Sequence, residues 1–265
     1  MILPQVHGTA PQHSNFLYTA CDSAYFDEFA QVLVNSAHVN STVPVHLHVF
    51  NPRPDQLCWI ESRPNLTATF EHVELSAFAS AAERLTQTTD DAVLLDQRKR
   101  TQSAMEKGND NTVLERMQKT YFACARFIRL NQMFDQSRTV LAIDVDAVIR
   151  QSLTLLPNTC DYYIHRITGK RARFLAGGIQ LNPTAAAEKF LNNYAAQLET
   201  AINQDYVYWG LDQDLLENTA NQHHWQQLPP ELIDWNMLES SVIWTAKGTR
   251  KSLAAFVSES ARYKT

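Results

Sequence analysis

Glycine is scarce in this chain of 265 residues, which contains seven in all, and only Gly8 precedes Gly108. The glycine-rich loops that hold phosphates in Rossmann and P-loop proteins need clustered glycines after an early strand, where the backbone turns tightly beside the ligand. The sequence therefore excludes both of these fingerprints, and a nucleotide would have to be bound in another way.

Cysteine is also sparse. The four cysteines, at positions 21, 58, 124 and 160, are far apart, with no C-x-x-C pair and no ligand-like spacing to histidine. This pattern argues against a structural zinc site and is typical of proteins in a reducing compartment. We therefore interpret all four as small buried apolar residues.

Neither an excess of positive charge nor a long apolar run is present. The formal net charge is −5 at pH 7, so the chain as a whole does not attract nucleic acid or anionic lipid. No stretch approaches about 18 uninterrupted apolar residues, and the N-terminus lacks the basic start and apolar core of a signal peptide. We expect no nucleic-acid partner, no membrane span and a cytoplasmic location. An anionic ligand must then be held by a local basic cluster or a bound cation.

Hydrophobic patterns alternate between strand and helix periods along most of the chain. Apolar residues recur at helical spacing from Phe26 to Ala37, and "VPVHLHVFN" (43–51) alternates as a strand does. A second helical stripe follows in "TYFACARFIRLNQMFD" (120–135), with Arg126 and Arg129 off it. This alternation predicts a sheet wrapped by helices. We expect one α/β domain over 1–265 with a mixed, mainly parallel central sheet flanked by helices, a tail at 1–14 and a helical surface excursion at 76–118.

Other elements follow the same rules. Strands are expected at 15–20, 67–73, 139–149 and 176–181, and helices at 54–62, 212–220 and the C-terminus. Asn182 and Pro183 form a good N-cap and N1 pair for the helix after them. The basic run "DQRKRTQ" (96–102) is expected to be a solvated helix face. His46 and His48 could present two metal ligands, but because no third ligand is in view we expect them to pack under a helix.

Two carboxylates, Asp144 and Asp146, flank Val145 at the end of the apolar strand "TVLAI". At this spacing both can point to the same side and meet one cation, while the backbone of Val145 faces a ligand. Mn²⁺ or Mg²⁺ suits such a pair, since it takes few carboxylates and fills its other positions with water and phosphate oxygens. The alternative is structural, with Asp144 capping a turn and Asp146 pairing with a surface cation.

Three further groups have both a functional and a structural interpretation. Gly177 and Gly178 would let a sugar ring approach the backbone, or they form a β-bulge. The turn "AKGTRK" (246–251) supplies the positive charge that a diphosphate needs, or it is merely solvated. Asp212 and Asp214 begin a helix, where aspartate is a common cap, so we expect one of them to be structural.

These motifs, in this order, resemble those of nucleotide-sugar glycosyltransferases of the GT-A fold, nearest to the retaining group that includes glycogenin and lipo-oligosaccharide galactosyltransferases. The resemblance extends from Phe16 to about Ser252 and includes "YTACDSAYF", "ACARFIRL", "AIDVDAVI", "FLAGGIQLN", "GLDQDLLEN" and "AKGTRK". It implies a Rossmann-like GT-A domain that transfers a sugar from a nucleotide-diphosphate donor, UDP-linked, to a glycan or other hydroxyl acceptor, with a DxD-bound metal ion.

The resemblance also implies a role for individual residues. Asp144 and Asp146 hold the metal ion, and Asp212 and Gln213 lie beside the anomeric carbon. The donor is contacted by Thr19, Ala20, Cys21, Asp22, Tyr25, Arg126, Val145, Ala176, Gly177, Gly178, Lys247, Gly248 and Lys251.

The chain departs from the family pattern at two positions. Where the family has a histidine as third metal ligand, this chain has Thr245, or Trp244 if the alignment slips by one residue. Neither is a good ligand, so we expect a weakly held ion, completed by water or bound together with the nucleotide, and a better competition of Mg²⁺ with Mn²⁺. Leu175 replaces the usual asparagine and loses one polar contact to the donor.

The resemblance implies retention of configuration, in which the leaving phosphate oxygen takes the acceptor proton and Gln213 steadies the cationic sugar. Inversion would instead need a carboxylate base, for which Asp212, Asp214 and Asp234 are the candidates.

Two functions other than glycosyl transfer are possible alternatives for this sequence. A sugar-phosphate nucleotidyltransferase generally needs a basic glycine-rich loop that is absent here, whereas a nucleotide-sugar or glycan-binding module without turnover agrees with the missing histidine.

Overall fold

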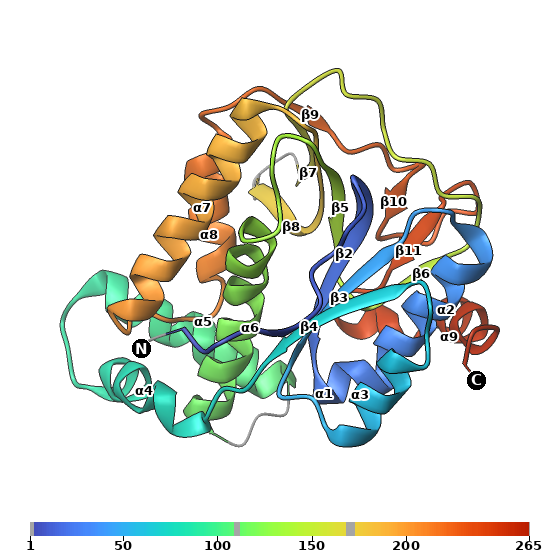
Figure 1. The fold of residues 1–265 in the computed structure, drawn as a ribbon. Coiled ribbons are helices and arrows are strands. Elements are labelled where there is room, and N and C mark those ends of the chain that lie inside the picture. Colours follow the sequence, from blue (N-terminus) through green and yellow to red (C-terminus); the bar gives the residue numbers. More distant parts are fainter. Residues whose placement is uncertain (1–2, 109–111, 168–172, 265) are drawn as a thin grey trace.

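A computed structural model describes residues 3–108, 112–167 and 173–264 of the chain. Its central sheet has eight strands in the order β1-β4-β3-β2-β5-β8-β7-β9 (Figure 1). The strands are β1 (His7–Gly8), β2 (Asn15–Asp22), β3 (Val45–Phe50), β4 (Leu66–Glu71), β5 (Thr139–Ile143), β7 (Tyr162–Ile167), β8 (Arg173–Leu181) and β9 (Trp225–Gln227). The core β4-β3-β2-β5 is parallel, while β8 is antiparallel to both β5 and β7. The predicted mixed sheet is confirmed.

The strand order reverses between β2 and β5, and this reversal positions the site. From β2 the chain proceeds outward through β3 and β4, then returns to pair β5 with the other side of β2. In open α/β sheets the crevice at such a switch point, outside the carboxyl ends of the strands, is where ligands bind. Asp22 ends β2 and Asp144 directly follows β5. Asp144 and Asp146 therefore lie at this crevice.

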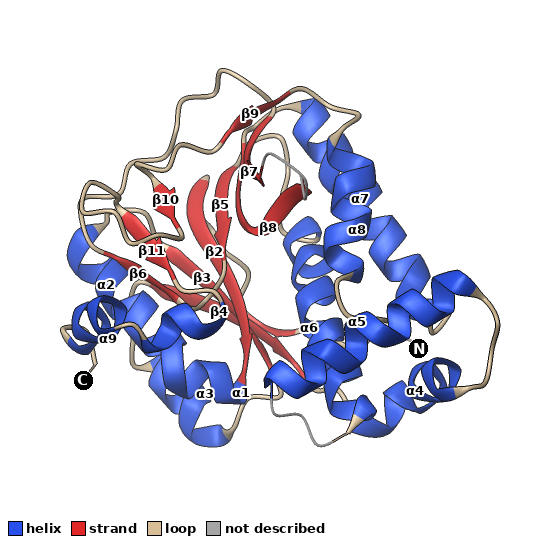
Figure 2. Cartoon of the chain, turned by 180° about the vertical axis from the view of Figure 1, so that it is seen from behind, coloured by secondary structure: helices blue, strands red, loops and turns tan. Residues whose placement is uncertain are grey.

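Helices cover both faces of the sheet (Figure 2). One face carries α4 (Ala79–Thr86), α5 (Ala92–Gly108), α6 (Val113–Asn131), α7 (Ala185–Asn203) and α8 (Leu211–Ala220). The other carries α1 (Ser23–Tyr25), a π-helical turn (Phe26–Ala30), α2 (Gln31–Asn40), α3 (Pro54–Glu61) and α9 (Ala254–Ala261). Because strand side chains alternate between faces, Phe16 and Tyr18 pack against the first group of helices and Leu17 against the second.

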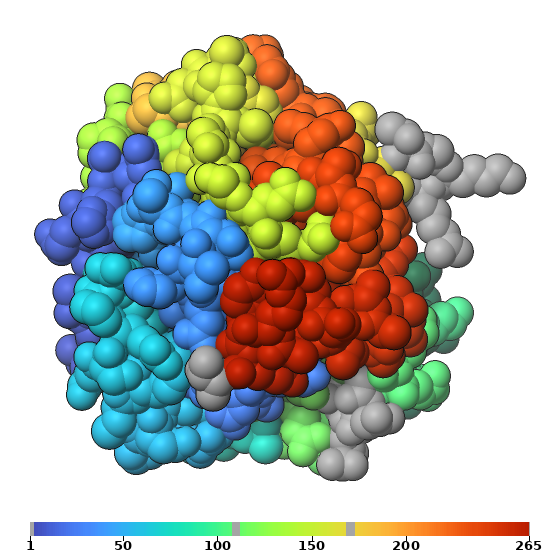
Figure 3. All heavy atoms as spheres, turned by 90° about the vertical axis from the view of Figure 1, so that its right-hand side faces the viewer, coloured from blue at the N-terminus to red at the C-terminus, as the bar shows by residue number. Residues whose placement is uncertain are grey.

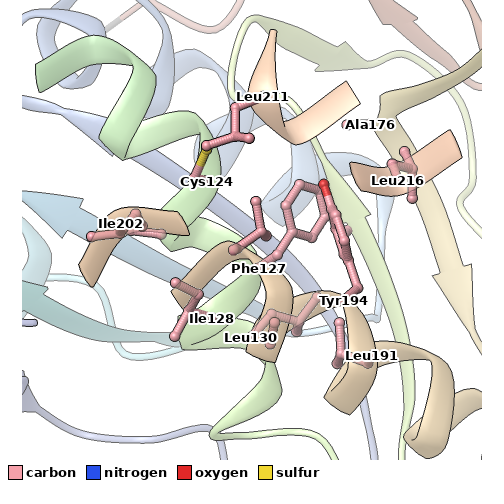
Figure 4. Close-up of a cluster of buried hydrophobic side chains, with 14 of the residues drawn as sticks. Cys124, Phe127, Ile128, Leu130, Ala176, Leu191, Tyr194, Ile202, Leu211 and Leu216 are labelled. Atoms are coloured by element: carbon pink, nitrogen blue, oxygen red, sulfur yellow. The ribbon is translucent and has the colours of Figure 1, made fainter. Parts of the chain in front are cut away.

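Packing between α6, α7 and α8 fixes the wall on one side of the crevice. Figure 4 shows Phe127 of α6 next to Tyr194 of α7, and Leu211 of α8 next to Cys124 of α6, and all four are buried. Helix α6 begins with a capping box, in which Thr112 Oγ1 accepts from Glu115 N at 3.1 Å and the Glu115 carboxylate accepts from Thr112 N at 3.2 Å. This wall brings Arg126 to the end of β5.

A second, smaller sheet closes the other side of the crevice. It has the order β10-β11-β6, formed by β10 (Ile233–Asp234), β11 (Ile243–Thr245) and β6 (Ala147–Ile149). Its register sets Thr245 opposite Ala147, one residue after the second carboxylate. The C-terminal segment then packs beside α2 (Figure 3), where Asn35 Nδ2 donates to Tyr263 O at 2.9 Å. These contacts carry the basic turn Gly248–Ser252 to the crevice.

Some local expectations were wrong. The helix after Pro183 is capped by Thr184, whose hydroxyl accepts from Ala187 N at 3.0 Å, because the Asn182 amide is committed to Cys160 O at 2.8 Å. Part of the expected tail joins the sheet, since β1 pairs with β4. Among the cysteines Cys58 is exposed on α3, whereas the other three are buried. Within the segment 76–118 the described residues form α4, α5 and the start of α6, with a non-helical connection at 87–91, and positions 109–111 lie outside the described residues.

A buried polar network lies beneath α6. His46 Nδ1 and Nε2 lie 2.9 Å and 3.0 Å from the hydroxyls of Thr67 and Thr69, as expected for histidines packed under a helix. Arg129, which lies off the apolar stripe, is buried too, because its Nε donates to the Glu71 carboxylate at 2.6 Å. A charged pair can be buried in this way only when each charge has a partner.

None of the helices in the described part of the chain is both long and apolar enough to cross a membrane.

Burial of His46 and His48 predicts a loss of stability in weak acid. Burial lowers the pKa of His46 from 6.5 to about 3 and that of His48 well below its usual value. The unfolded state therefore binds more protons below pH 6.5, and the free energy of unfolding falls as the pH drops from that value. Each histidine contributes up to about 1.4 kcal/mol per pH unit.

Urea unfolding between pH 7.5 and 5 tests this expectation. In His46→Gln the dependence of unfolding free energy on pH should be shallower by about one proton, whereas His13→Gln, at an exposed position, should keep the wild-type slope. Equal slopes for His46→Gln and the wild type would show that His46 does not stay neutral in the folded protein.

Candidate functional site

Asp144 is held at the end of β5 by Gly177 and Arg126. Its N–H donates to Gly177 O at 3.1 Å, and its carboxylate accepts a short hydrogen bond from Arg126 Nη1. A Cβ on Gly177 would overlap Asp144 Oδ2, whereas one on Gly178 would meet Ile233 Cδ1 and Leu228 Cδ2, each at 3.2 Å. Each glycine thus has a packing role in the fold: Gly177 leaves room for a carboxylate of the protein, and Gly178 leaves room for core side chains.

Arg126 joins two carboxylates that are far apart in the sequence. Besides its bond to Asp144, its Nη2 donates to Ala176 O at 3.3 Å and lies 3.6 Å from Asp212 Oδ2. Burial raises the pKa of Asp144, but Arg126 outweighs it, so the net pKa is below the usual value. For Asp212 burial dominates, and its pKa is raised in spite of Arg126. The arginine thus keeps Asp144 charged at neutral pH.

Asp146 is paired with a different cation. Lys251 Nζ lies 2.8 Å from Asp146 Oδ2 and donates to Tyr25 OH at 2.7 Å. The same ammonium group lies 4.1 Å and 4.7 Å from the ring centroids of Tyr25 and Phe29. Burial and the nearby Asp144 raise the pKa of Asp146 to about 6. The structural alternative for this aspartate, pairing with a cation, is therefore observed, and the cation comes from the basic turn.

Residues at the end of β2 are mostly occupied by the protein. The Asp22 side chain caps α1 by accepting from Tyr25 N at 2.8 Å, as expected for a helix N-cap. Thr19 and Cys21 are buried, as is Val145 after β5, whereas Ala20 is partly exposed and Tyr25 is 37% exposed. A ligand at this strand end can therefore reach the Tyr25 side chain, whereas Thr19 and Cys21 lie below the surface.

The start of α8 is set by Gly210 and Arg100. Gly210 has φ of 92° and serves as N-cap, so neither aspartate caps the helix. Asp214 is the structural one, because it accepts from Arg100 Nη1 at 2.7 Å and from Tyr208 OH at 2.8 Å. The basic run at 96–102 is thus not only a solvated face. The Asp212 side chain, in contrast, is turned toward Arg126.

Gln213 is bound to strand β8. With its amide oriented to satisfy both groups, the nitrogen donates to Phe174 O at 3.0 Å and the oxygen accepts from Ala176 N at 3.1 Å. Leu175, between these two residues, is buried. Gln213 therefore lies at the edge of the site with both ends of its amide engaged.

Of the two candidates for a third metal ligand, only Thr245 remains. The Trp244 indole N–H donates to Leu238 O at 2.7 Å, and Arg150 stacks on its ring with Cζ 3.6 Å from the centroid, so Trp244 faces away. Thr245 is buried, and its Oγ1 has no hydrogen-bond partner among the described residues. This orphaned oxygen lies in the strand that pairs with β6, directly after Asp146.

The donor set suits an ion that takes most of its ligands from elsewhere. Within 3–108, 112–167 and 173–264 no group of three or more His, Cys, Asp or Glu side chains could hold a metal. Asp144 and Asp146 supply two carboxylates, and Mg²⁺ is commonly bound by one or two carboxylates together with substrate phosphates and water. The residues therefore fit such an ion, although each carboxylate is already neutralised by a cation of the protein.

Positive charge surrounds these carboxylates. Lys247 is exposed just before the basic turn, and its charge lowers the pKa of both Asp144 and Asp212. Gly248 has φ of 63° and open space around it, so the turn depends on its conformational freedom and not on close packing. Together Arg126, Lys247 and Lys251 form the local basic cluster that an acidic protein needs to hold an anion.

Sequence reasoning missed the partners of several site residues. Arg100, which clamps Asp214, and Phe29, which underlies Lys251, gave no signal beyond a basic run and an apolar stripe. A cavity of about 640 Å³ lies elsewhere, between the N-terminal segment and the ends of α6 and α7, lined by Leu3, Pro4, Val6, Arg129, Gln132, Glu199 and Asn203.

No protein-family model matches the chain, and no curated protein matches its sequence. Solved structures do match in fold. The apo structure of the bifunctional glycosyltransferase WbbM has a TM-score of 0.53 at 13% identity, covering 94% of this chain and 50% of that one. The galactosyltransferase LgtC, in complex with donor and acceptor sugar analogs, has a TM-score of 0.53 at 12% identity, covering 95% of this chain and 96% of LgtC.

This chain thus spans about half the length of the WbbM structure and nearly all of the LgtC structure. At such low identity the likeness shows the fold and not the activity. The chain has the fold of these GT-A glycosyltransferases, as the sequence resemblance predicted.

The overlap between a Gly177 side chain and Asp144 can be measured by a double-mutant cycle. Gly177→Ala should lower the free energy of unfolding by about 1–3 kcal/mol, the usual cost of overpacking. Asp144→Ala removes the overlapping carboxylate, so the double variant should be more stable than the sum of the two single changes predicts. Additive changes would mean that Gly177 is not required by Asp144.

Proposed function

We propose that the chain is a glycosyltransferase of the hexosyltransferase type, which moves a sugar from a nucleotide-diphosphate donor, UDP-linked, to a hydroxyl of a glycan or another acceptor. The proposal is carried by the position of Asp144 and Asp146. Both lie at the switch point of a GT-A fold, and the basic side chains of Arg126, Lys247 and Lys251 surround them. A diphosphate is the ligand that such a mixture of carboxylates and cations suits best.

We further propose that Asp144 and Asp146 hold Mn²⁺ or Mg²⁺ in the working enzyme. When bound, such an ion supplies Lewis-acid neutralisation of the leaving diphosphate. Lys251 and Lys247 would add charge-assisted contacts to the phosphate oxygens, since both belong to the basic segment 246–251 beside the two carboxylates. Arg126, fixed by Asp144 and the Ala176 carbonyl, orients the donor sugar from the opposite side.

The remaining proposed roles follow the resemblance. The residues that surround the nucleoside, the diphosphate and the sugar would be Thr19, Ala20, Cys21, Asp22, Tyr25, Val145, Ala176, Gly177, Gly178 and Gly248. Asp212 and Gln213 would lie beside the anomeric carbon. Because Gln213 is anchored to the backbone of β8, it can present a fixed dipole to a developing positive charge, which supports a stabilising role over a nucleophilic one.

Retention of configuration is the proposed stereochemical course. The acceptor hydroxyl would attack on the face of the leaving group, and its proton would pass to the departing phosphate oxygen, so that no side-chain base is needed. The hydrogen bonds of the site support this course. Asp214 is engaged by Arg100 and Tyr208, and Asp234 accepts from Asn236 N and Leu238 N at 2.9 Å and 2.7 Å, which leaves Asp212 as the single candidate base of the three for inversion.

A second candidate function is a nucleotide-sugar-binding module without turnover. Two observations favour it: both carboxylates of the pair are already neutralised by protein cations, and Thr245 replaces an imidazole ligand. A sugar-phosphate nucleotidyltransferase has less support, because the early glycine-rich loop that it generally needs is absent. For all of these functions we keep the expected cytoplasmic location, with which the four free thiols agree.

A panel of nucleotide sugars assayed for Mn²⁺-dependent release of the nucleotide tests the proposal. The enzyme should release UDP, and Asp144→Asn should lower the rate by about 100-fold or more, as for loss of other electrostatic groups in active sites. Asp234→Asn serves as the matched control. Its amide oxygen can still accept from Asn236 N and Leu238 N, so this variant should retain activity.

Stabilisation by UDP without release from any donor would favour the binding module instead. Unchanged release in Asp144→Asn would place the chemistry elsewhere.

A further inference from the structure

Lys251 occupies the place beside Asp146 that a metal ion would need. Its ammonium group lies 2.8 Å from Asp146 Oδ2, the distance of a direct charge-assisted hydrogen bond. Tyr25 OH accepts a second bond at 2.7 Å, and the rings of Tyr25 and Phe29 lie under the cation. This lysine is therefore the counter-ion of the second carboxylate.

The charges of the free site are already balanced. Three carboxylates, from Asp144, Asp146 and Asp212, meet Arg126 and Lys251 at short range and the exposed Lys247 nearby. A divalent ion that approaches Asp146 meets the positive charge of Lys251 and competes with it for the same oxygen. It can bind well only if the lysine leaves and finds another anion.

Lys251 can leave more easily than Arg126. Arg126 is anchored at three points, by Asp144, the Ala176 carbonyl and Asp212. Lys251 instead extends from a short turn over the half-exposed ring of Tyr25, on a flexible four-carbon stem. The diphosphate of a nucleotide is the nearest anion that could receive it, because it would lie against the same turn.

We propose that Lys251 couples the binding of the metal ion to that of the nucleotide diphosphate. In the free protein it holds Asp146 and keeps the ion out, and it transfers to a phosphate oxygen when the diphosphate arrives, so that ion and diphosphate bind strongly only together. Thr245 strengthens the effect, since it offers no imidazole to hold the ion without the nucleotide. The inference rests on the proposed use of a nucleotide-diphosphate donor.

The coupling must be reciprocal. If UDP raises the affinity for Mn²⁺ by some factor, Mn²⁺ raises the affinity for UDP by the same factor, and couplings of this kind are typically about 5- to 150-fold. The reciprocity supplies two independent measurements: Mn²⁺ titrations followed by the electron paramagnetic resonance signal of the free ion, with and without UDP, and UDP titrations by calorimetry, with and without Mn²⁺. Both should give the same factor in the wild type.

Substitution of Lys251 should uncouple the two ligands. In Lys251→Met the affinity for Mn²⁺ alone should rise by about tenfold or more, because Asp146 loses its counter-ion, and the factor by which UDP enhances it should fall by a similar amount, to the part that direct contact between phosphate oxygens and the ion supplies. Lys247→Met is the matched control: it removes a lysine of the same basic cluster that forms no ion pair with Asp146, so it should weaken UDP binding while changing the affinity for Mn²⁺ alone by less than about threefold.

A second variant keeps the test sharp if Lys251→Met folds poorly. Tyr25→Phe preserves the ring and removes only the hydroxyl that holds Lys251, so it should raise the affinity for Mn²⁺ alone in the same direction by a smaller factor. The proposal is overturned if the wild type binds Mn²⁺ equally with and without UDP, or if neither variant binds Mn²⁺ more tightly than the wild type.

These outcomes are separate from those that test catalysis. Coupled binding of Mn²⁺ and UDP without turnover of any donor would keep the role of Lys251 and remove the transferase. Turnover with independent binding of the two ligands would keep the transferase and remove the role of Lys251.

Discussion

The structure of the site depends on the neutralisation of three carboxylates at the switch point of the sheet, of which Asp146 and Asp212 are buried and Asp144 is partly exposed. Arg126 joins Asp144 to Asp212, and Lys251 holds Asp146. Without these cations the desolvation of the carboxylates would cost several kcal/mol each. The strand order brings the aspartates together, while α6 and the C-terminal turn bring the cations, so the two walls of the crevice are held to the sheet by charge as well as by packing.

This arrangement explains how an acidic protein can bind an acidic ligand. The net charge of −5 offers no general attraction to a nucleotide, but Arg126, Lys247 and Lys251 offset the carboxylates where the diphosphate would lie and can donate to its oxygens. The same cations balance the carboxylates when no ligand is present. We therefore expect ligands to bind by exchange of ion-pair partners: the metal ion replaces a protein cation at the carboxylates, and that cation moves to the diphosphate.

The order of helices and strands and the place of the Asp144 and Asp146 pair could be predicted from the sequence, because period and burial are local properties that the residues themselves carry. The contact partners of the site residues could not be predicted from the sequence. The contact of Arg100 with Asp214, the anchoring of Gln213 to β8 and the room that Gly177 leaves for Asp144 join segments far apart in the chain. Even the N-cap at Thr184 was missed, since a tertiary hydrogen bond claims Asn182.

Anomalous diffraction from crystals soaked with Mn²⁺ and UDP tests the central claim most directly, because it locates the ion and the diphosphate at once. The account predicts a manganese peak between the carboxylates of Asp144 and Asp146, a phosphate oxygen among its ligands, and Lys251 turned from Asp146 to the diphosphate. A nucleotide bound elsewhere, or a peak absent from these carboxylates while UDP is present, would contradict it.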